Sequence, residues 1–241
     1  INSGMMSLGA NPTAGLQRNK TLTSGFARYE KDWNAQTQTF VGIGHTERAP
    51  DYWELISKES ANSTSAFQAV APERTTQLDL GLTYQSERLQ SFASAYFSQI
   101  EDFILIQSNV LKPSGMGTRN STIARNIDAQ TWGGEAGLHY GWTPSWSTLA
   151  SVAYVHGQNK TDGHALGQIS PLESRLGVNW QQGSWAAGGL LRWVAAQHRY
   201  ATNEGNIVGQ DLGSAKGFAI TSVHAAYRWQ NMWTFSAGID N

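Results

Sequence analysis

The residues of this chain that could do chemistry are methionines and histidines in stretches without regular periodicity. Met5, Met6 and Met116 are such methionines, and His164 and His198 lie in or beside two other irregular stretches. A thioether is a suitable ligand for Cu(I), and an imidazole is a suitable ligand for Cu(II). One interpretation is a metal site in the loops. The other is that these are ordinary loop residues that bind nothing.

No catalytic constellation is evident in the sequence. Glu101 and Asp102 are adjacent on a predicted strand, so their side chains should point to opposite faces and could not act as an acid–base pair. No histidine has a serine and an aspartate at a recognisable motif spacing; the six are His45, His139, His156, His164, His198 and His224. The chain also has no glycine-rich phosphate-binding loop. We therefore expect that it is not an enzyme.

The stretch that would position these loops runs from Pro72 to Ile106. Apolar and polar residues alternate strictly in its first half; the apolar ones are Leu78, Leu80, Leu82 and Tyr84, and the polar-side ones are Gln77, Asp79, Gly81 and Thr83. This period of two is typical of a β-strand with one apolar and one polar face. After a turn at 85–88, a second strand extends from Leu89 to about Ile106, longer than strands of ordinary globular domains. The pattern predicts a hairpin in a wall between lipid and water.

The composition is compatible with such a wall and excludes several classes of protein and of binding site. The 241 residues carry 17 Lys and Arg against 18 Asp and Glu, with no basic run, so a nucleic-acid partner is not expected. Mean hydropathy is −0.40 and no run of 18 apolar residues occurs, which excludes a transmembrane helix but leaves alternating transmembrane strands possible. Cysteine is absent, so disulfides and thiolate metal sites are excluded. No signal peptide precedes Ile1, which indicates a mature protein or a fragment.

The periodicity predicts about ten strands, which are joined alternately by short and long connections. The short connections are 32–36, 85–88, 142–146, 181–184 and 230–231, and the long ones are 47–73, 107–121, 157–168 and 197–216. One rim would then carry only tight turns and the other only long loops. Outer-membrane β-barrels show this asymmetry.

Tryptophans support the same interpretation. Seven of the ten lie in or beside the short turns: Trp33, Trp142, Trp146, Trp180, Trp185, Trp229 and Trp233. An indole ring favours the membrane–water interface, where its body is in an apolar region and its N–H remains hydrated. We expect an interfacial girdle. The alternative is that these rings pack the end of a soluble core.

Several motifs resemble the C-terminal part of the barrel of TonB-dependent outer-membrane receptors. These motifs are Glu47-Arg48-Ala49-Pro50-Asp51-Tyr52-Trp53-Glu54-Leu55, Pro72-Glu73-Arg74 with Asp79-Leu80-Gly81, Trp132-Gly133-Gly134-Glu135, Pro171-Leu172 and Ala237-Gly238-Ile239-Asp240-Asn241. Their order covers nearly the whole chain, and the stretch ERAPDYWELIS at 47–57, together with the 123–142 strand, is most similar to the copper-receptor branch. Asp79 stands where the family usually has Glu.

The resemblance implies an all-β, antiparallel transmembrane barrel segment that belongs to a plugged barrel of about 22 strands. Residues 1–241 would be a partial barrel domain, because nothing resembles the plug and the chain stops before the family's final strand. The first and last strands would then need other strands as neighbours.

The resemblance also implies a function. It predicts active transport of a metal, copper above all, or of a metal chelate such as a siderophore, across the outer membrane of a bacterium. The implied partners are outer-membrane lipid and the inner-membrane TonB complex, which would act through the plug. Copper would be the transported substrate, with no covalently bound cofactor, and Met5 and Met6 are the first candidate ligands. Alternatives are a passive porin-like or autotransporter barrel, a barrel-based hydrolase and a soluble β-sandwich binding module.

Charged residues on the polar sides of the predicted strands have an expected structural role. Asp79, Glu135, Glu173 and Arg175, together with Gln77 and Asn179, should face the water-filled lumen or the plug. A second group should brace the loop at the rim: Arg48, Glu54 and Glu73.

Overall fold

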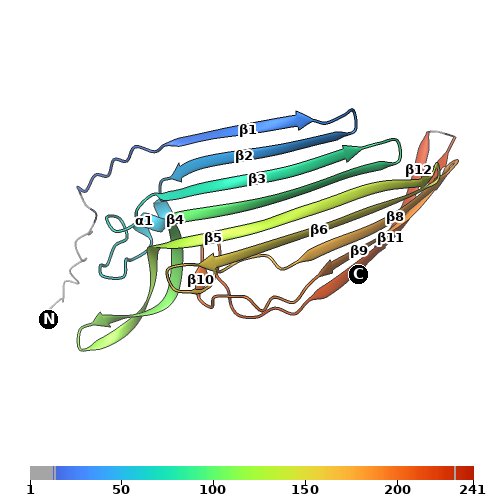
Figure 1. Ribbon diagram of the computed structural model, residues 1–241. Coiled ribbons are helices and arrows are strands. Elements are labelled where there is room, and N and C mark those ends of the chain that lie inside the picture. The colour runs from blue at the N-terminus through green and yellow to red at the C-terminus, as the bar shows by residue number, and fades with distance from the viewer. Residues whose placement is uncertain (1–12, 14, 231) are drawn as a thin grey trace.

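The chain forms one antiparallel β-sheet in a computed structural model that describes residue 13, residues 15–230 and residues 232–241 (Figure 1). The strands are β1 (Ser24–Asp32), β2 (Thr37–Arg48), β3 (Glu73–Gln85), β4 (Leu89–Ser114), β5 (Gly117–Thr143), β6 (Trp146–Asn159), β7 (His164–Ala165), β8 (Glu173–Gln182), β9 (Trp185–Val194), β10 (Glu204–Gly205), β11 (Phe218–Trp229) and β12 (Trp233–Asp240). The ten long strands lie in the order β1-β2-β3-β4-β5-β6-β8-β9-β11-β12. Sequential neighbours are therefore neighbours in space, as in a meander, and the ten predicted strands are confirmed.

Three short elements were not expected from the sequence. The two-residue strands β7 and β10 pair with β6 and β4, and α1 (Tyr52–Ile56) is a single helical turn in the first long connection. Asp51 caps α1, because its carboxylate accepts the Glu54 amide and the Glu54 carboxylate accepts the Asp51 amide. None of the described helical residues forms a span long and apolar enough to cross a membrane.

The two faces of the sheet differ in chemistry. On β3, Leu78, Leu80 and Leu82 are 42 to 48% exposed, whereas Gln77 and Asp79 between them are half-buried. Strand pairing continues the leucine row, since Leu78 is opposite Ile43 and Phe97, and Phe97 is opposite Trp132. We call this side the apolar face and the other side the polar face. Apolar side chains exposed in rows indicate a surface that is covered by lipid rather than by water.

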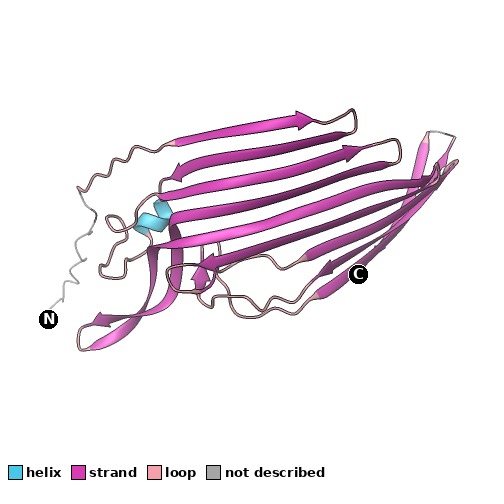
Figure 2. Cartoon of the chain, in the orientation of Figure 1, coloured by secondary structure: helices cyan, strands magenta, loops and turns pink. Residues whose placement is uncertain are grey.

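The connections separate the two ends of the sheet. Residues 33–36, 86–88, 144–145 and 183–184 form short connections at one end, which we call the turn end, and β11 ends and β12 begins at the same end. Residues 49–72, 160–172 and 195–217 form long connections at the other, the loop end (Figure 2). The predicted asymmetry of the rims is confirmed in this respect.

The predicted loop at 107–121 is wrong. β4 continues to Ser114 and β5 begins at Gly117, so this segment is a long hairpin that projects beyond the loop end (Figure 1). Its tip is the two-residue turn Gly115-Met116, in which Gly115 has φ +60°. The sequence between 107 and 121 is rich in Ser, Asn, Gly and Pro and lacks alternation, which is why it resembles a loop.

Glu101 and Asp102 also differ from expectation. The pairing of β4 with β5 shifts between Ile100 and Phe103, and Asp102 has φ +57°, which is typical of a β-bulge. The bulge brings both carboxylates to one guanidinium, since Arg74 Nη2 lies 3.2 Å from Glu101 Oε2 and 2.7 Å from Asp102 Oδ2. They are therefore not on opposite faces, and their ion pairs fix the start of the projecting hairpin.

The buried apolar residues of the described chain gather at the loop end, on both sides of this hairpin. On one side the connection 49–72 supplies Ala66 and Val70, which pack with Ile104, Ile106 and Ala124. On the other side Leu166, from the connection 160–172, packs with Leu105, Ile127 and Ala129. The long connections are thus held against the hairpin by two small cores.

Candidate ligand-binding rim

The polar face carries a row of paired residues across the middle strands. Gly81 is opposite Ser94, Ser94 opposite Glu135, Glu135 opposite Ala153, and Ala153 opposite Glu173. Because directly paired residues share a face, Glu135 and Glu173 lie on the same side as Asp79 and Arg175, two positions away from members of this row. The four charged residues thus share the polar face, and their contact with lumen water or with the plug stays a prediction.

A charged cluster forms where this row reaches β8 and β9. Arg192 donates to both carboxylate oxygens of Glu173, from Nε at 2.9 Å and from Nη2 at 2.7 Å, and Arg175 Nε donates to Oε1 at 2.8 Å. Two guanidinium groups on one carboxylate leave a positive charge on the polar face. The residue that sequence reasoning missed is Arg192, which lies opposite Arg175 in the pairing of β8 with β9.

The predicted rim residues Arg48, Glu54 and Glu73 form one network. Arg48 Nη1 lies 3.0 Å from Glu54 Oε2, and Arg48 Nη2 lies 3.2 Å from Glu73 Oε2. Glu54 is buried and belongs to α1, so the network ties the helical turn to the ends of β2 and β3. This arrangement is suited to bracing the connection 49–72.

A second anchor of the same connection was missed from the sequence. Glu59 Oε2 accepts Lys112 Nζ at 2.7 Å and Arg119 Nη2 at 2.9 Å, and both donors lie on the projecting hairpin. Lys112 is itself buried and also donates to the carbonyls of Ser60 and Ser63. The Lys112 ammonium, followed by the Arg119 guanidinium, holds the pKa of Glu59 below its ordinary value.

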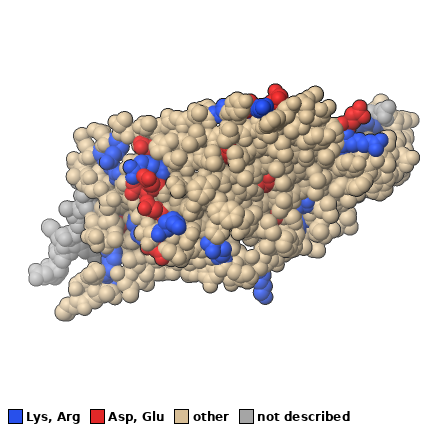
Figure 3. All heavy atoms as spheres, in the orientation of Figure 1, with Lys and Arg blue, Asp and Glu red and all other residues tan. Residues whose placement is uncertain are grey.

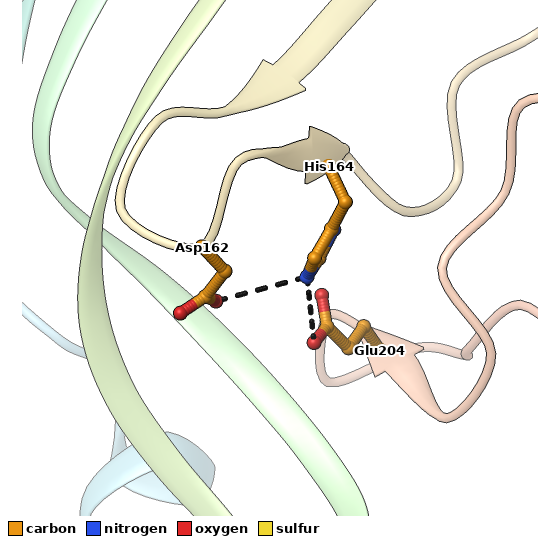
Figure 4. A group of neighbouring side chains, drawn as sticks. All are labelled: Asp162, His164 and Glu204. Carbon is orange, nitrogen blue, oxygen red and sulfur yellow. Dashed lines mark ion pairs between the residues drawn. The ribbon is translucent and has the colours of Figure 1, made fainter.

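A third cluster joins the other two long connections to β5. Arg125 Nη2 donates to Asp162 Oδ2, and Asn159 Nδ2 donates to the same oxygen at 2.7 Å. His164 Nε2 lies 3.8 Å from Asp162 Oδ2 and 3.6 Å from Glu204 Oε1 (Figure 4). The three potential metal-ligand atoms of Asp162, His164 and Glu204 all lie within 4.8 Å of one another.

The two carboxylates of this cluster have opposite electrostatic environments. The Arg125 guanidinium lowers the pKa of Asp162, which stays ionised. Burial raises the pKa of Glu204, which is only 5% exposed. The three side chains come from 160–172 and 195–217, so no local sequence motif contains all of them. Only His164 was a candidate from the sequence.

The remaining candidates for metal binding do not converge in the described residues. Met116 is exposed at the tip of the projecting hairpin, and His198 is exposed in the connection between β9 and β11. Met5 and Met6 lie outside the described residues. They remain a prediction of the sequence.

The seven tryptophans named above all lie at the turn end. Trp146 and Trp180 are cross-strand partners, as are Trp229 and Trp233. The indole N–H groups of Trp33 and Trp142 donate to Thr39 and Thr148, each at 2.9 Å. Each thereby keeps a polar contact while its ring is exposed, as an interfacial residue requires.

Charged residues are concentrated away from the middle of the wall. On the side shown in Figure 3, acidic and basic atoms gather mainly toward the loop end, and smaller groups lie along the upper edge and near the turn end. The intervening surface is mostly uncharged. The loop end is therefore the part of the molecule with the polar groups and connections to contact a ligand.

These features are those of an antiparallel β-barrel segment, and the chain belongs to the TonB-dependent receptor family. The family model described as TonB dependent receptor-like, beta-barrel matches residues 7–241. Among curated proteins, no match was found.

Three solved structures illustrate the similarity. The structure named copper transporter OprC is 46% identical, with a TM-score of 0.87, and the match covers 96% of this chain and 36% of that one. A mutant of the ferric enterobactin receptor PfeA of Pseudomonas aeruginosa is 15% identical, with a TM-score of 0.68 and coverage of 90% and 34%. The ferric-catecholate import receptor Fiu of E. coli K12 is 16% identical, with a TM-score of 0.65 and coverage of 90% and 30%.

The chain thus spans about a third of the length of these structures. Likeness to PfeA and Fiu supports the fold alone, whereas likeness to the copper transporter extends to sequence. All three names describe transport proteins or receptors. The all-β antiparallel fold and the family that the sequence resembles are confirmed.

Proposed function

We propose that this chain is the C-terminal part of the barrel of an outer-membrane receptor that imports copper with energy from the TonB complex. The chain would lie in the outer membrane of a bacterium, with its turn end toward the periplasm and its loop end outside. Residues 1–241 act as one partial barrel domain, and plug and remaining strands come from elsewhere in the receptor. A metal chelate is the alternative substrate class.

The observation that carries the proposal is the 46% identity to a copper transporter over 96% of the chain. The wall supports it, because its exposed apolar face suits lipid and its polar face suits a lumen or a plug. In this proposal Asp79, Glu135, Glu173 and Arg175 contact lumen water or plug, while Arg48, Glu54 and Glu73 brace a loop. The tryptophans at the turn end form the periplasmic girdle, and Met5 and Met6 are candidate copper ligands.

The test uses the full-length receptor. Purified protein in detergent should bind copper under oxidising or reducing conditions, and cells that express it should accumulate copper. Accumulation should fall to the level of receptor-free cells when the TonB complex is deleted, because a plugged barrel needs energy to open. Retention of uptake without TonB, together with steady conductance in a planar bilayer, would instead indicate a passive channel. Lack of copper binding in both redox states would leave the chelate as substrate.

The methionine pair is tested in the same assay. The double substitution Met5→Leu/Met6→Leu keeps volume and apolar character but removes both thioethers. Copper(I) affinity should fall at least tenfold if these residues are ligands. The matched control is Met116→Leu, at the exposed hairpin tip, which should leave affinity unchanged.

A further inference from the structure

We propose that Asp162, His164 and Glu204 form a binding site for a borderline divalent transition-metal ion, Zn(II) or Cu(II), that joins two long connections at the loop end. His164 and Asp162 belong to the connection between β6 and β8, and Glu204 belongs to the connection between β9 and β11. The proposal concerns equilibrium binding at this rim. It is independent of whether the receptor transports copper.

The separations of the ligand atoms fit a shared ion better than they fit direct contacts. His164 Nε2 lies 3.6 Å from Glu204 Oε1 and 3.8 Å from Asp162 Oδ2, which is too long for hydrogen bonds. Two ligand atoms held at about 2.0–2.2 Å from one tetrahedral ion lie roughly 3.3–3.6 Å apart. The two contacts of the imidazole nitrogen need to shorten by at most a few tenths of an ångström to reach this range. The two carboxylate oxygens, which lie within 4.8 Å of each other, would close to the same range around one ion.

The tautomer of His164 also favours a metal. Its Nδ1 lies 2.8 Å from the carbonyl oxygen of Ala165, an acceptor, so Nδ1 must carry the proton of that hydrogen bond. In a neutral imidazole this leaves a lone pair on Nε2, directed at two carboxylates (Figure 4). Repulsion between this lone pair and the two anionic oxygens is relieved by a cation at Nε2, either a proton or a metal ion, and the metal titration below distinguishes the two. Histidine ligands of metals characteristically donate their other N–H to a carbonyl or carboxylate in this way.

Glu204 supplies an independent observation. Its side chain is 94% buried, and Oε2 is a buried oxygen without a hydrogen-bond partner among the described residues. A carboxylate oxygen that is buried and unpaired loses its hydration without a compensating hydrogen bond, which is unfavourable. The nearest cation, Arg125, lies 3.8 Å from Oε1 and donates instead to Asp162. Oε2 of Glu204 therefore retains coordination capacity, although Asn159 and Arg125 lie near this carboxylate.

Arg125 and Asn159 complete the site rather than occupy it. Both donate to Asp162 and fix the orientation of its carboxylate, as hydrogen bonds to ligating carboxylates commonly do. The formal charge of two carboxylates and one guanidinium is −1, so a divalent cation leaves the cluster at +1. The donor set of one nitrogen and two oxygens suits Zn(II) or Cu(II), whereas Cu(I) favours sulfur and Mg(II) and Ca(II) favour oxygen alone.

The test is metal titration of the full-length receptor in detergent after chelator treatment. Isothermal titration with Zn(II) should reveal one saturable equivalent, and its affinity should be at least tenfold weaker in His164→Asn and in Glu204→Gln. The control is His198→Asn, an exposed histidine of the neighbouring connection, which should retain that equivalent. Mg(II) should give no saturable heat.

Cu(II) provides a second, spectroscopic measurement. The electron paramagnetic resonance spectrum of the Cu(II)-loaded receptor should show coupling to one imidazole nitrogen that disappears in His164→Asn and persists in His198→Asn. Folding of each variant is checked by heat-modifiable migration of the barrel on gels. The proposal is overturned if folded His164→Asn retains the Zn(II) affinity of the parent receptor and the imidazole signal. Because neither measurement involves TonB or uptake, a negative result here leaves the transport proposal intact, and failure of transport leaves this site intact.

Discussion

At the scale of single residues, Glu59 determines how the connection 49–72 is held at the loop end. Its carboxylate is shared by Lys112 and Arg119, and its backbone pairs with β5, since Glu59 N donates to Thr122 O and Ala124 N donates to Glu59 O. The backbone bonds do not depend on pH, but the two ion pairs require the ionised carboxylate. This residue therefore gives the connection an acid-sensitive component.

The direction of that sensitivity follows from the lowered pKa of Glu59. Stabilisation is complete above the unfolded-state pKa of about 4.3 and is lost as pH falls through the lower folded-state pKa. Hydrogen exchange of residues 58–70 in the full-length receptor, corrected for intrinsic rates, should accelerate below about pH 4. In Glu59→Gln the amides of residues 58–70 should exchange faster at neutral pH, because the free energy of local opening falls by about 1.5–3 kcal/mol. Their corrected exchange rates should no longer rise at acidic pH.

The matched control for this experiment is Glu87→Gln, at the turn end. It should leave exchange of the connection unchanged at every pH. If Glu59→Gln retained the same acid transition as the parent protein, another group would be responsible for it.

At the scale of elements, three neighbouring strands are locked by stacked side chains on the polar face. The Phe40 ring of β2 lies over Gly81 of β3, so that a Cβ at residue 81 would be 2.0 Å from Phe40 Cε1. The Arg28 guanidinium of β1 lies over the same ring at 3.8 Å from its centroid. The absence of a side chain at Gly81 is what lets the ring lie flat against the sheet.

Gly81→Val should therefore force Phe40 out of its position and separate it from Arg28. We expect a loss of about 1–3 kcal/mol, the range for overpacking, measured as a shift of the urea midpoint of the full-length receptor. In the Phe40→Ala background the same substitution should cost much less, because the clashing ring is gone. Gly25→Val is the control, since nothing lies within 4 Å of the added Cβ. Equal losses with and without Phe40 would contradict this account.

The strands also show which parts of the fold could be predicted from the sequence. Strict alternation in segments such as 77–84 predicts strands and faces, because burial of one face by lipid leaves a period of two in the sequence. The projecting hairpin lacks this signal because its arms pair with each other. At its base, residues 104–106 and 124–129 are covered by loops that contribute Val70 and Leu166. Only Gly115-Met116 could have indicated it, as a glycine-containing two-residue turn.

The candidate site was predictable to a smaller extent. Arg48, Glu54 and Glu73 could be placed together because a family motif and one strand start lie near each other in sequence. Glu204 could not, because it reaches the rim only through the pairing of β10 with β4, about a hundred positions earlier. Contacts between long connections depend on how the whole sheet curves, which no local pattern encodes.

At the scale of the whole molecule, the sheet has the inverse of a soluble core, because its most exposed face is its most apolar one. In the proposed outer-membrane receptor, lipid covers the apolar face and stabilises this arrangement. Leu80 and Ser94 test the assignment directly, because they lie on adjacent strands and on opposite faces: Leu80 is opposite Ala95, and Ser94 is opposite Gly81. Leu80→Arg should place a charge in the hydrocarbon layer and cost about 2–4 kcal/mol near the bilayer midplane. Ser94→Arg should cost far less, because its side chain faces Glu135 and the polar interior. Reversible urea unfolding of the full-length receptor in lipid vesicles measures the loss of stability for both substitutions.

A large loss of stability for Leu80→Arg in vesicles that becomes small in detergent micelles would identify the bilayer as the cause, since micelles deform around a charge more readily. If instead Ser94→Arg were the more destabilising of the two, the faces would be reversed and the apolar row would point into the barrel.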